Sequence, residues 1–150
     1  MAVCRHGCGG LVAGAAPHGL AAIVPGRLDD EARSAYARAF DARRDTTGGL
    51  GSLESCLSGA DLFDVVVGGV IVGRYALKAM QRANGTEVFI VAAAGAAPGA
   101  DLVASVAPYV ETQCPGADCL TVNTRRRGLV KKLAAQGWTL DSYVMRKKIK

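Results

Sequence analysis

The sequence predicts one domain of the mixed α/β class (an α+β mixed sheet), in which an antiparallel meander precedes a β-α-β-α-β half. Three strand-like runs are separated by Gly68-Gly69 and Asn84-Gly85, which are typical of tight hairpin turns because these residues accept a positive φ. A helix-length crossover then leads to another short apolar run, which predicts a parallel pair with a right-handed connection. At 150 residues, half of them apolar, the chain is long enough for a real core.

The N-terminal part divides into an irregular segment, expected over residues 1–26, and a domain expected over residues 27–150, with Ala21–Val24 as a short first strand. Leu28–Arg44 predicts a helix, because acidic residues at its start and arginines at its end complement the helix dipole. Leu53–Leu57 predicts one or two further helical turns.

The meander is expected to consist of strands at Phe63–Val67, Val70–Arg82 and Glu87–Ala94. Alternation in the middle strand puts Arg74 on one face, and Tyr75 on the other.

The second half is expected to begin with a helix over Leu102–Gln113, capped by the carboxylate of Asp101 and kinked or stopped early at Pro108. A buried strand at Cys119–Asn123 follows. The remaining elements are a helix over Arg125–Gln136, ended by Gly137, and a last strand over Thr139–Lys148.

The net charge of +5 is concentrated at the C-terminal end. Residues 121–150 hold nine Lys/Arg and one acid, whereas residues 1–120 hold nine Lys/Arg and twelve acids. This asymmetry indicates an anionic partner, which is a phosphorylated cofactor, a nucleic acid or an acidic protein face. The alternative is a solvated helix face followed by a frayed basic tail.

The five cysteines and the lack of a conspicuous secretory signal favour a reducing, cytoplasmic compartment. Cys4, Cys8 and His18 match no standard zinc spacing, so no metal site is predicted. Val88–Val110 is long and nearly uncharged, but its acid and prolines argue against a membrane span.

Three segments, in their order, carry a resemblance to a known family: FDVVVGGVIVGRYALKA, TEVFIVAAAGAAPGADL and CLTVNTRRRGLVKKLAAQGWTLDSYVMRKKI. A meander feeding a β-α-β-α-β half, with a helix that closes on a Gly-aromatic pair, resembles the GNAT superfamily of N-acetyltransferases. The short, divergent form is similar to GNAT-like proteins of tailed phages and prophages. The resemblance thus implies the cytoplasm of a bacterium or of a phage-infected host.

The resemblance implies that the sheet splays between Glu87–Ala94 and Cys119–Asn123, and that acetyl-CoA lies in the gap. It implies a backbone contact of the pantetheine arm with the middle of Glu87–Ala94 and of the pyrophosphate with the following loop. The cofactor-binding residues implied in this way are Val91, Ala92, Ala93, Gly95, Ala97, Gly99, Ala100 and Arg126. Glu87 is a candidate general base. An active protein would be an acyl-CoA-dependent N-acyltransferase with an amine substrate.

The sequence departs from the family at both of its characteristic motifs. In the pyrophosphate loop only Gly99 fits, and Asp101 places a carboxylate where a phosphate would bind the helix N-terminus. The family's Asn, Ala and Tyr before the Gly-aromatic pair fall on Arg126, Leu129 and Leu133, and a leucine cannot donate a proton to the CoA thiolate.

Two alternatives to an enzyme follow from these departures. The first is a catalytically inactive, phage-type GNAT-fold protein for interaction or assembly, with a protein partner or as a homo-oligomer. The second is nucleic-acid binding through Arg125–Arg127 and the basic C-terminal residues. The lack of an aromatic platform among these cations argues against nucleic acid as a partner.

Overall fold

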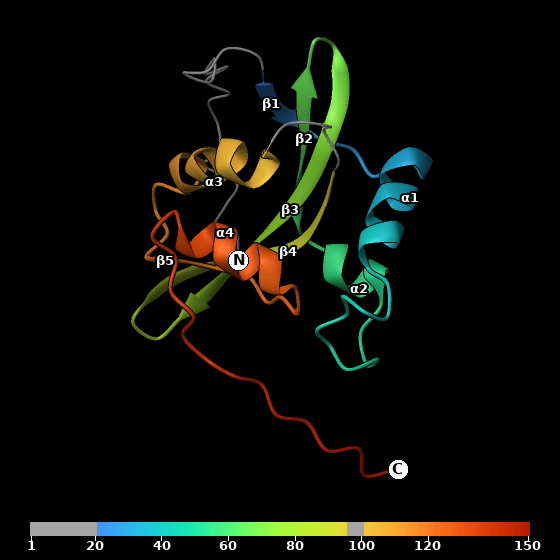
Figure 1. The fold of residues 1–150 in the computed structure, drawn as a ribbon, viewed down its shortest axis with the longest axis vertical. Coiled ribbons are helices and arrows are strands. Elements are labelled where there is room, and N and C mark those ends of the chain that lie inside the picture. Colours follow the sequence, from blue (N-terminus) through green and yellow to red (C-terminus); the bar gives the residue numbers. More distant parts are fainter. Residues whose placement is uncertain (1–20, 96–100) are drawn as a thin grey trace.

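The computed structural model describes residues 21–95 and 101–150, which form a five-stranded mixed sheet with four helices (Figure 1). The elements are β1 (Ala21–Pro25), α1 (Asp30–Ala39), α2 (Leu53–Leu57), β2 (Asp61–Val67), β3 (Val70–Arg82), β4 (Gly85–Gly95), α3 (Leu102–Gln113), β5 (Cys119–Thr121) and α4 (Arg127–Ala134). The strands lie in the order β1-β2-β3-β4-β5. The antiparallel pairing of β2, β3 and β4 and the parallel pairing of β4 with β5 are as the sequence predicts. In addition, β1 pairs with β2 in the antiparallel direction.

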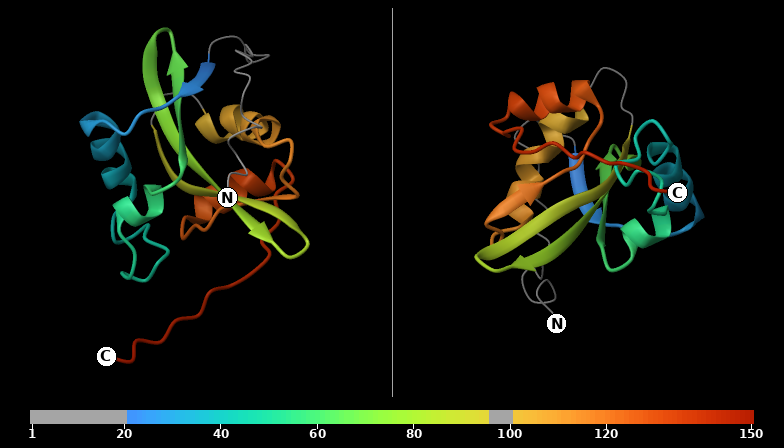
Figure 2. Two further views of the ribbon diagram at one scale, coloured as in Figure 1. Left: turned by 180° about the vertical axis from the view of Figure 1, so that it is seen from behind. Right: turned by 90° about the horizontal axis from the view of Figure 1, so that it is seen from below.

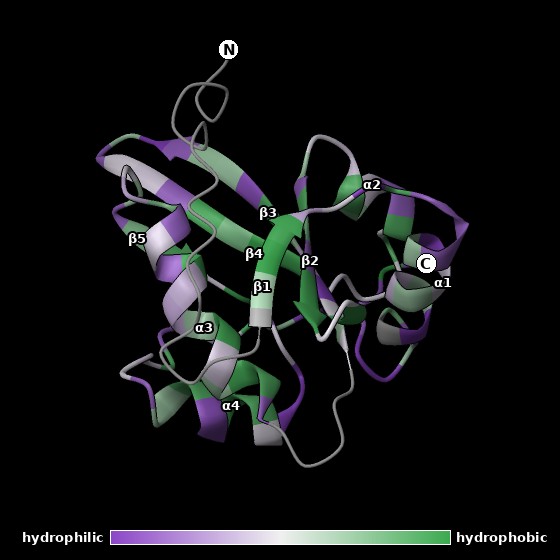
Figure 3. Ribbon diagram, turned by 90° about the horizontal axis from the view of Figure 1, so that it is seen from above, coloured by the Kyte–Doolittle hydropathy of each residue, from purple (hydrophilic) through white to green (hydrophobic). Residues whose placement is uncertain are grey.

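The helices cover both faces of the sheet, with α1 and α2 on one side and α3 and α4 on the other (Figure 2). Tyr75 and Leu77 of β3 pack with Val110 of α3 in one buried cluster. Ala76, between them in sequence, packs in a second cluster with Ala32 and Tyr36 of α1. This alternation confirms the expected facing of β3, and apolar residues gather along the central strands (Figure 3).

The first hairpin forms as predicted, because Gly68 and Gly69 have φ values of 55° and 80° and join the paired residues Val67 and Val70. The second hairpin turns one residue earlier than expected. Its loop is Ala83-Asn84, and Gly85 is the first residue of β4. Glycine is required at this first position of β4, since a Cβ on Gly85 would lie 2.5 Å from a carboxylate oxygen of Asp118.

Helix α1 is shorter than the predicted Leu28–Arg44 at both ends. Asp29 caps its start, where its Oδ1 accepts a hydrogen bond from the Ala32 N–H at 2.8 Å. After Ala39 the carboxylate of Asp41 accepts from the N–H groups of Arg43 and Arg44 at 2.9 and 3.1 Å. These local bonds replace the helical ones, so the two arginines lie in a turn.

Helix α3 occupies the predicted residues and does not stop at Pro108. Pro108 is exposed, so its ring meets solvent on the outer side of the helix. Asp101 caps the helix as predicted: its Oδ1 accepts from the N–H groups of Val103 and Ala104 at 3.1 and 3.2 Å.

The last elements are shorter than predicted, with β5 ending at Thr121 and α4 spanning Arg127–Ala134. The chain leaves α4 through Gly137, as expected, with φ at 87° and the Trp138 N–H bonded to the Leu133 carbonyl at 3.1 Å.

The predicted strand at Thr139–Lys148 is wrong. Residues 139–150 form no strand, are exposed throughout and extend away from the sheet (Figure 1). A strand needs a ladder partner, and the neighbouring β5 has only three residues, so solvent is the better environment for this basic segment. One side chain holds it to the domain, since Arg146 Nη2 donates to the Thr46 carbonyl at 2.6 Å.

No helix within residues 21–95 and 101–150 has the length and apolar character needed to cross a bilayer.

Candidate functional site between strands β4 and β5

Strands β4 and β5 separate after a short stretch of pairing. They share three pairs, Glu87 with Cys119, Val88 with Leu120, and Phe89 with Thr121. Beyond Phe89, β4 continues to Gly95 against β3 alone, while the chain after Thr121 leaves the sheet. The β5-facing edge of β4 therefore has no ladder partner from Ile90 onward within the described residues.

A β-bulge lies at the start of this unpaired edge. In the pairing of β3 with β4, Leu77 faces Ile90 and Ala76 faces Ala92, so Val91 is an extra residue. A bulge bends its strand and increases its twist, and bulges are frequent beside binding sites. The bend at Val91 thus accompanies the divergence of β4 from β5.

A cavity of about 110 Å³ lies in the gap. Ile90 to Ala93 of β4 form one wall, and Val122 to Thr124, with Arg126 and Leu129 of the α4 region, form the second. A cavity of this size is below the roughly 300–1,000 Å³ of drug-sized ligand sites. It can hold a small acyl group with its acceptor atom, but not a whole nucleotide cofactor.

The third wall of the cavity comes from α1 and the loop after it. Tyr36 lines the cavity from α1, Phe40 from the residue that caps its C-terminal end, and Arg44 and Thr46 from the loop. The pKa of the Tyr36 phenol is raised above its usual value, first by burial and second by the charge of Asp64. This hydroxyl therefore keeps its proton.

Four of the residues implied by the resemblance meet at this cavity, namely Val91, Ala92, Ala93 and Arg126. Gly95 lies at the end of β4 and does not line it. A Cβ at Gly95 would lie 2.9 Å from the Gly73 Cα, so this glycine permits close packing of β4 on β3. Ala97, Gly99 and Ala100 lie outside the described residues.

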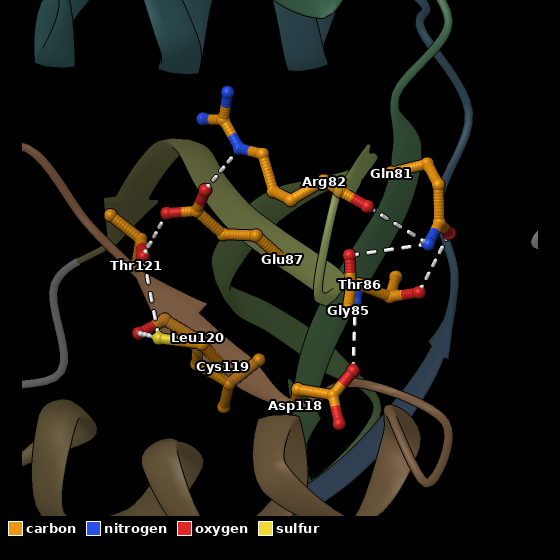
Figure 4. Close-up of polar contacts among 9 residues, drawn as sticks. All are labelled: Gln81, Arg82, Gly85, Thr86, Glu87, Asp118, Cys119, Leu120 and Thr121. Atoms are coloured by element: carbon orange, nitrogen blue, oxygen red, sulfur yellow. Dashed lines mark hydrogen bonds and ion pairs between the residues drawn. The ribbon is translucent and has the colours of Figure 1, made fainter.

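Glu87 pairs with Cys119 at the closed end of the gap and is not among the residues lining the cavity. Its side chain points instead toward Arg82 and Thr121 (Figure 4). Its Oε1 accepts from the Thr121 hydroxyl at 2.6 Å, and its Oε2 lies 2.7 Å from Arg82 Nε. The Thr121 hydrogen bond, followed by that from Arg82, lowers the pKa of Glu87. The carboxylate thus stays ionised and engaged, whereas a general base needs a free lone pair and a pKa near the working pH.

The N-terminus of α3 is already neutralised by protein groups. Besides capping the helix, the Asp101 carboxylate lies 3.1 Å from Lys132 Nζ of α4. The bond from the Ala104 N–H, followed by the one from Lys132, lowers the pKa of Asp101. An ionised carboxylate therefore occupies first-turn N–H groups that a phosphate would otherwise use.

Two side chains of the cavity lining, Tyr36 and Arg44, were not predicted as site residues. Tyr36 reaches the cavity from within α1, where it is also part of the buried core. Arg44 reaches it because α1 stops at Ala39 and the following loop lies near the start of α4, where Arg125 Nη1 donates to the Asp45 carbonyl at 3.4 Å. The only sequence signal was Asp41, whose side chain can compete for helical N–H groups. Cys4, Cys8 and His18 lie outside the described residues, and no cluster of potential metal ligands occurs in the part of the chain that the structure describes.

The chain is similar in fold to several solved structures of acetyltransferases. A possible acetyltransferase from Clostridium difficile 630 superposes with a TM-score of 0.57 at 13% identity, over 87% of this chain and 99% of that chain. The aminoglycoside acetyltransferase meta-AAC0020 from an uncultured soil metagenomic sample, in complex with sisomicin, gives 0.57 at 11% identity, over 87% and 96%. A ribosomal-protein-alanine N-acetyltransferase from Brucella melitensis biovar Abortus 2308 gives 0.57 at 16% identity, over 85% and 99%.

These similarities establish the fold as that of GNAT acetyltransferases, which confirms the predicted fold class. Comparison of the sequence with protein-family models and with curated proteins gives no match.

Proposed function

We propose that this chain is an acyl-CoA-dependent N-acyltransferase that transfers an acetyl group from acetyl-CoA to an amine. The observation that carries the proposal is the partnerless edge of β4 at Val91–Ala93, which opens into the cavity. An unpaired strand edge presents N–H and C=O groups at regular spacing, and an amide-containing chain such as pantetheine can pair with it. The acetyltransferase fold of the structural neighbours supports the same reading.

The chemistry needs few protein groups. Acetyl-CoA supplies an activated acyl group as a thioester. The protein orients the thioester along β4, and any backbone N–H of this edge that faces the thioester oxygen stabilises the charge that develops there. Arg126, the N-cap residue of α4, adds positive charge to the cavity.

Proton transfer must be arranged without a carboxylate or imidazole, since neither lines the cavity in the part of the chain described by the structure. Hydroxyl groups that can donate to the leaving thiolate line the cavity at Tyr36, Thr46 and Thr124, and we take Thr124 as the donor because it lies beside Arg126. Its Oγ1 accepts from the Arg126 N–H at 3.0 Å, so its own proton is directed elsewhere. Leu133, where the family favours a tyrosine, is buried.

A steric block tests the proposal. Ala93 lines the cavity and is exposed, so Ala93→Leu fills the gap without disturbing a core. We expect calorimetry to show acetyl-CoA binding by the wild type and at least about tenfold weaker binding by Ala93→Leu. Ala104→Leu, on an exposed position of α3, is the matched control. Equal binding by both variants, or no binding by the wild type, would refute the proposal.

A second candidate is an interaction or assembly protein. It is favoured by the exposed C-terminal segment, where the side chains of Tyr143, Met145 and Ile149 are 85%, 95% and 94% exposed. A partner protein or a second copy would cover these residues. Sedimentation velocity of the full chain, compared with a chain ending at Trp138, tests self-association. The phage-type assignment and nucleic-acid binding stay predictions.

A further inference from the structure

The charged side chains that line the cavity are both arginines, Arg44 from the loop after α1 and Arg126 at the start of α4. No Asp or Glu is among the described lining residues. The Arg126 guanidinium makes no hydrogen bond or ion pair within residues 21–95 and 101–150. Arg44 has only weak partners, the exposed Asp41 at 3.8 Å and the Arg38 carbonyl at 3.4 Å. The cavity therefore carries positive charge that the protein leaves largely uncompensated.

The two arginines line the cavity from different segments, Arg44 from the loop after α1 and Arg126 from the start of α4. If the acyl donor lies along β4 at Val91–Ala93, the space between α1 and the start of α4 remains for the acceptor. A protonated amine in that space would meet two guanidinium groups of like charge, and water reduces the repulsion because both arginines are solvent-exposed. An acceptor with an anionic group would instead form charge-assisted hydrogen bonds with the arginines, whose planar donors match phosphate and carboxylate oxygens.

We infer that the acceptor is a small amine that also carries a phosphate, phosphonate or carboxylate group, and that Arg44 and Arg126 bind this group. The inference rests on the proposed function and names the substrate class of the same site. Polyamines are excluded as good acceptors by the same charges.

The arginines also assist the chemistry. Positive charge that the bound anion does not neutralise lowers the pKa of the ammonium group, which releases its first proton to solvent and becomes the reactive, neutral amine. The amine nitrogen then attacks the thioester carbonyl carbon and forms the C–N bond. The C–S bond breaks, the electron pair leaves on the thiolate, and the proton released by nitrogen neutralises the thiolate, directly or through water.

The test uses three probes with a common three-carbon chain: propylamine, 3-aminopropylphosphonate and 1,3-diaminopropane. Binding of each is followed by NMR at the arginine Nε groups, which requires no turnover. We expect saturable shifts at Arg44 and Arg126 with the phosphonate, and no competition from the diamine. Arg44→Ala and Arg126→Ala should each raise the Kd of the phosphonate about tenfold, the loss of one charge-assisted interaction.

Arg127→Ala is the matched control, because Arg127 is exposed, adjacent to Arg126 and not among the lining residues. Its Kd for the phosphonate should equal that of the wild type. Circular dichroism of all three variants confirms that they are folded. If the phosphonate binds no better than propylamine, or if Arg127→Ala weakens it as much as Arg126→Ala, the inference is wrong.

Separate titrations keep the two proposals apart. If acetyl-CoA binds but the phosphonate shows no preference, the proposed function stands and the anionic acceptor is refuted. If the phosphonate binds at both arginines while acetyl-CoA does not, the anion site is supported and the transferase is refuted. If the arginine variants weaken acetyl-CoA but not 3′-dephospho-CoA, the arginines hold the cofactor phosphate and the acceptor assignment is overturned.

Discussion

Arg74 is the buried charge on which the α1 wall of the cavity depends. Its side chain is only 5% exposed, and its Nη1 lies 3.1 Å from Oδ1 of Asp64, which is 13% exposed. Its Nη2 lies 3.3 Å from Glu31 of α1, whose side chain is 80% exposed. The arginine therefore links β3 to its neighbour β2 and to α1, the helix that contributes Tyr36 to the cavity.

Replacing Arg74 with methionine keeps most of the side-chain volume and removes the charge. Asp64 is then left buried without its counter-ion, and breaking a buried pair in this way costs about 3 kcal/mol. For a domain of this size, that loss corresponds to a fall in Tm of about 6–12 °C. Glu31→Gln removes only an exposed partner, so we expect a loss of about 0–1 kcal/mol.

The double variant Arg74→Met/Asp64→Leu separates the pair from the packing. Because it removes both charges together, its stability should lie well above that of Arg74→Met. The assay is urea unfolding followed by circular dichroism, with unchanged m-values as the check on two-state behaviour. The reasoning fails if the double variant is as unstable as the single one, or if Arg74→Met costs no more than Glu31→Gln.

Three further predictions concern the ends of β4 and α3. Asp101→Gly should cost only roughly a few tenths of a kcal/mol, because glycine is itself a favourable N-cap residue. It should tighten acetyl-CoA binding in calorimetry by vacating first-turn N–H groups, and unchanged affinity would contradict this. Because the pKa of Glu87 is lowered by folding, its stabilising contribution is present above its unfolded pKa and is lost as pH falls through its folded pKa. Glu87→Gln should therefore flatten the acid limb of a plot of urea midpoint against pH. An unaltered acid limb would count against this prediction. Gly95→Ala should cost about 1–3 kcal/mol in urea unfolding, because its Cβ would lie 2.9 Å from the Val72 carbonyl; a neutral effect would show that the backbone yields.

The sheet was predictable from the sequence because its information is local. The two hairpin signals and the period-2 pattern of Val70–Arg82 reproduce β2, β3 and β4 within a few residues. The wrong strand at Thr139–Lys148 has the same local character, with alternating apolar residues. It fails because pairing depends on a distant partner, and three-residue β5 offers little edge to pair with.

The site was predictable only in part. The β4 wall and Arg126 followed from a resemblance in the order of elements. The α1 wall did not, because it depends on where the helix ends, and a single side chain, Asp41, decides that through bonds to two N–H groups. Arg44 adds the second positive charge to the cavity lining, and the hydrophobic pattern of the sequence does not indicate that it lies there.

Within the described residues, the backbone N–H and C=O groups on the β5-facing edge of β4 have no strand partner beyond Phe89. Bare strand edges are templates for self-pairing, and natural proteins normally shield them. Here Tyr36 and Phe40 line the same cavity as Val91 to Ala93, and a volume of about 110 Å³ leaves room for a narrow chain rather than a whole strand. A ligand that pairs with this edge binds only the folded state, so it raises Tm in proportion to the logarithm of its excess over Kd. Thermal shift is thus a direct screen for the molecule that completes the sheet, and the same molecule should protect the protein from aggregation.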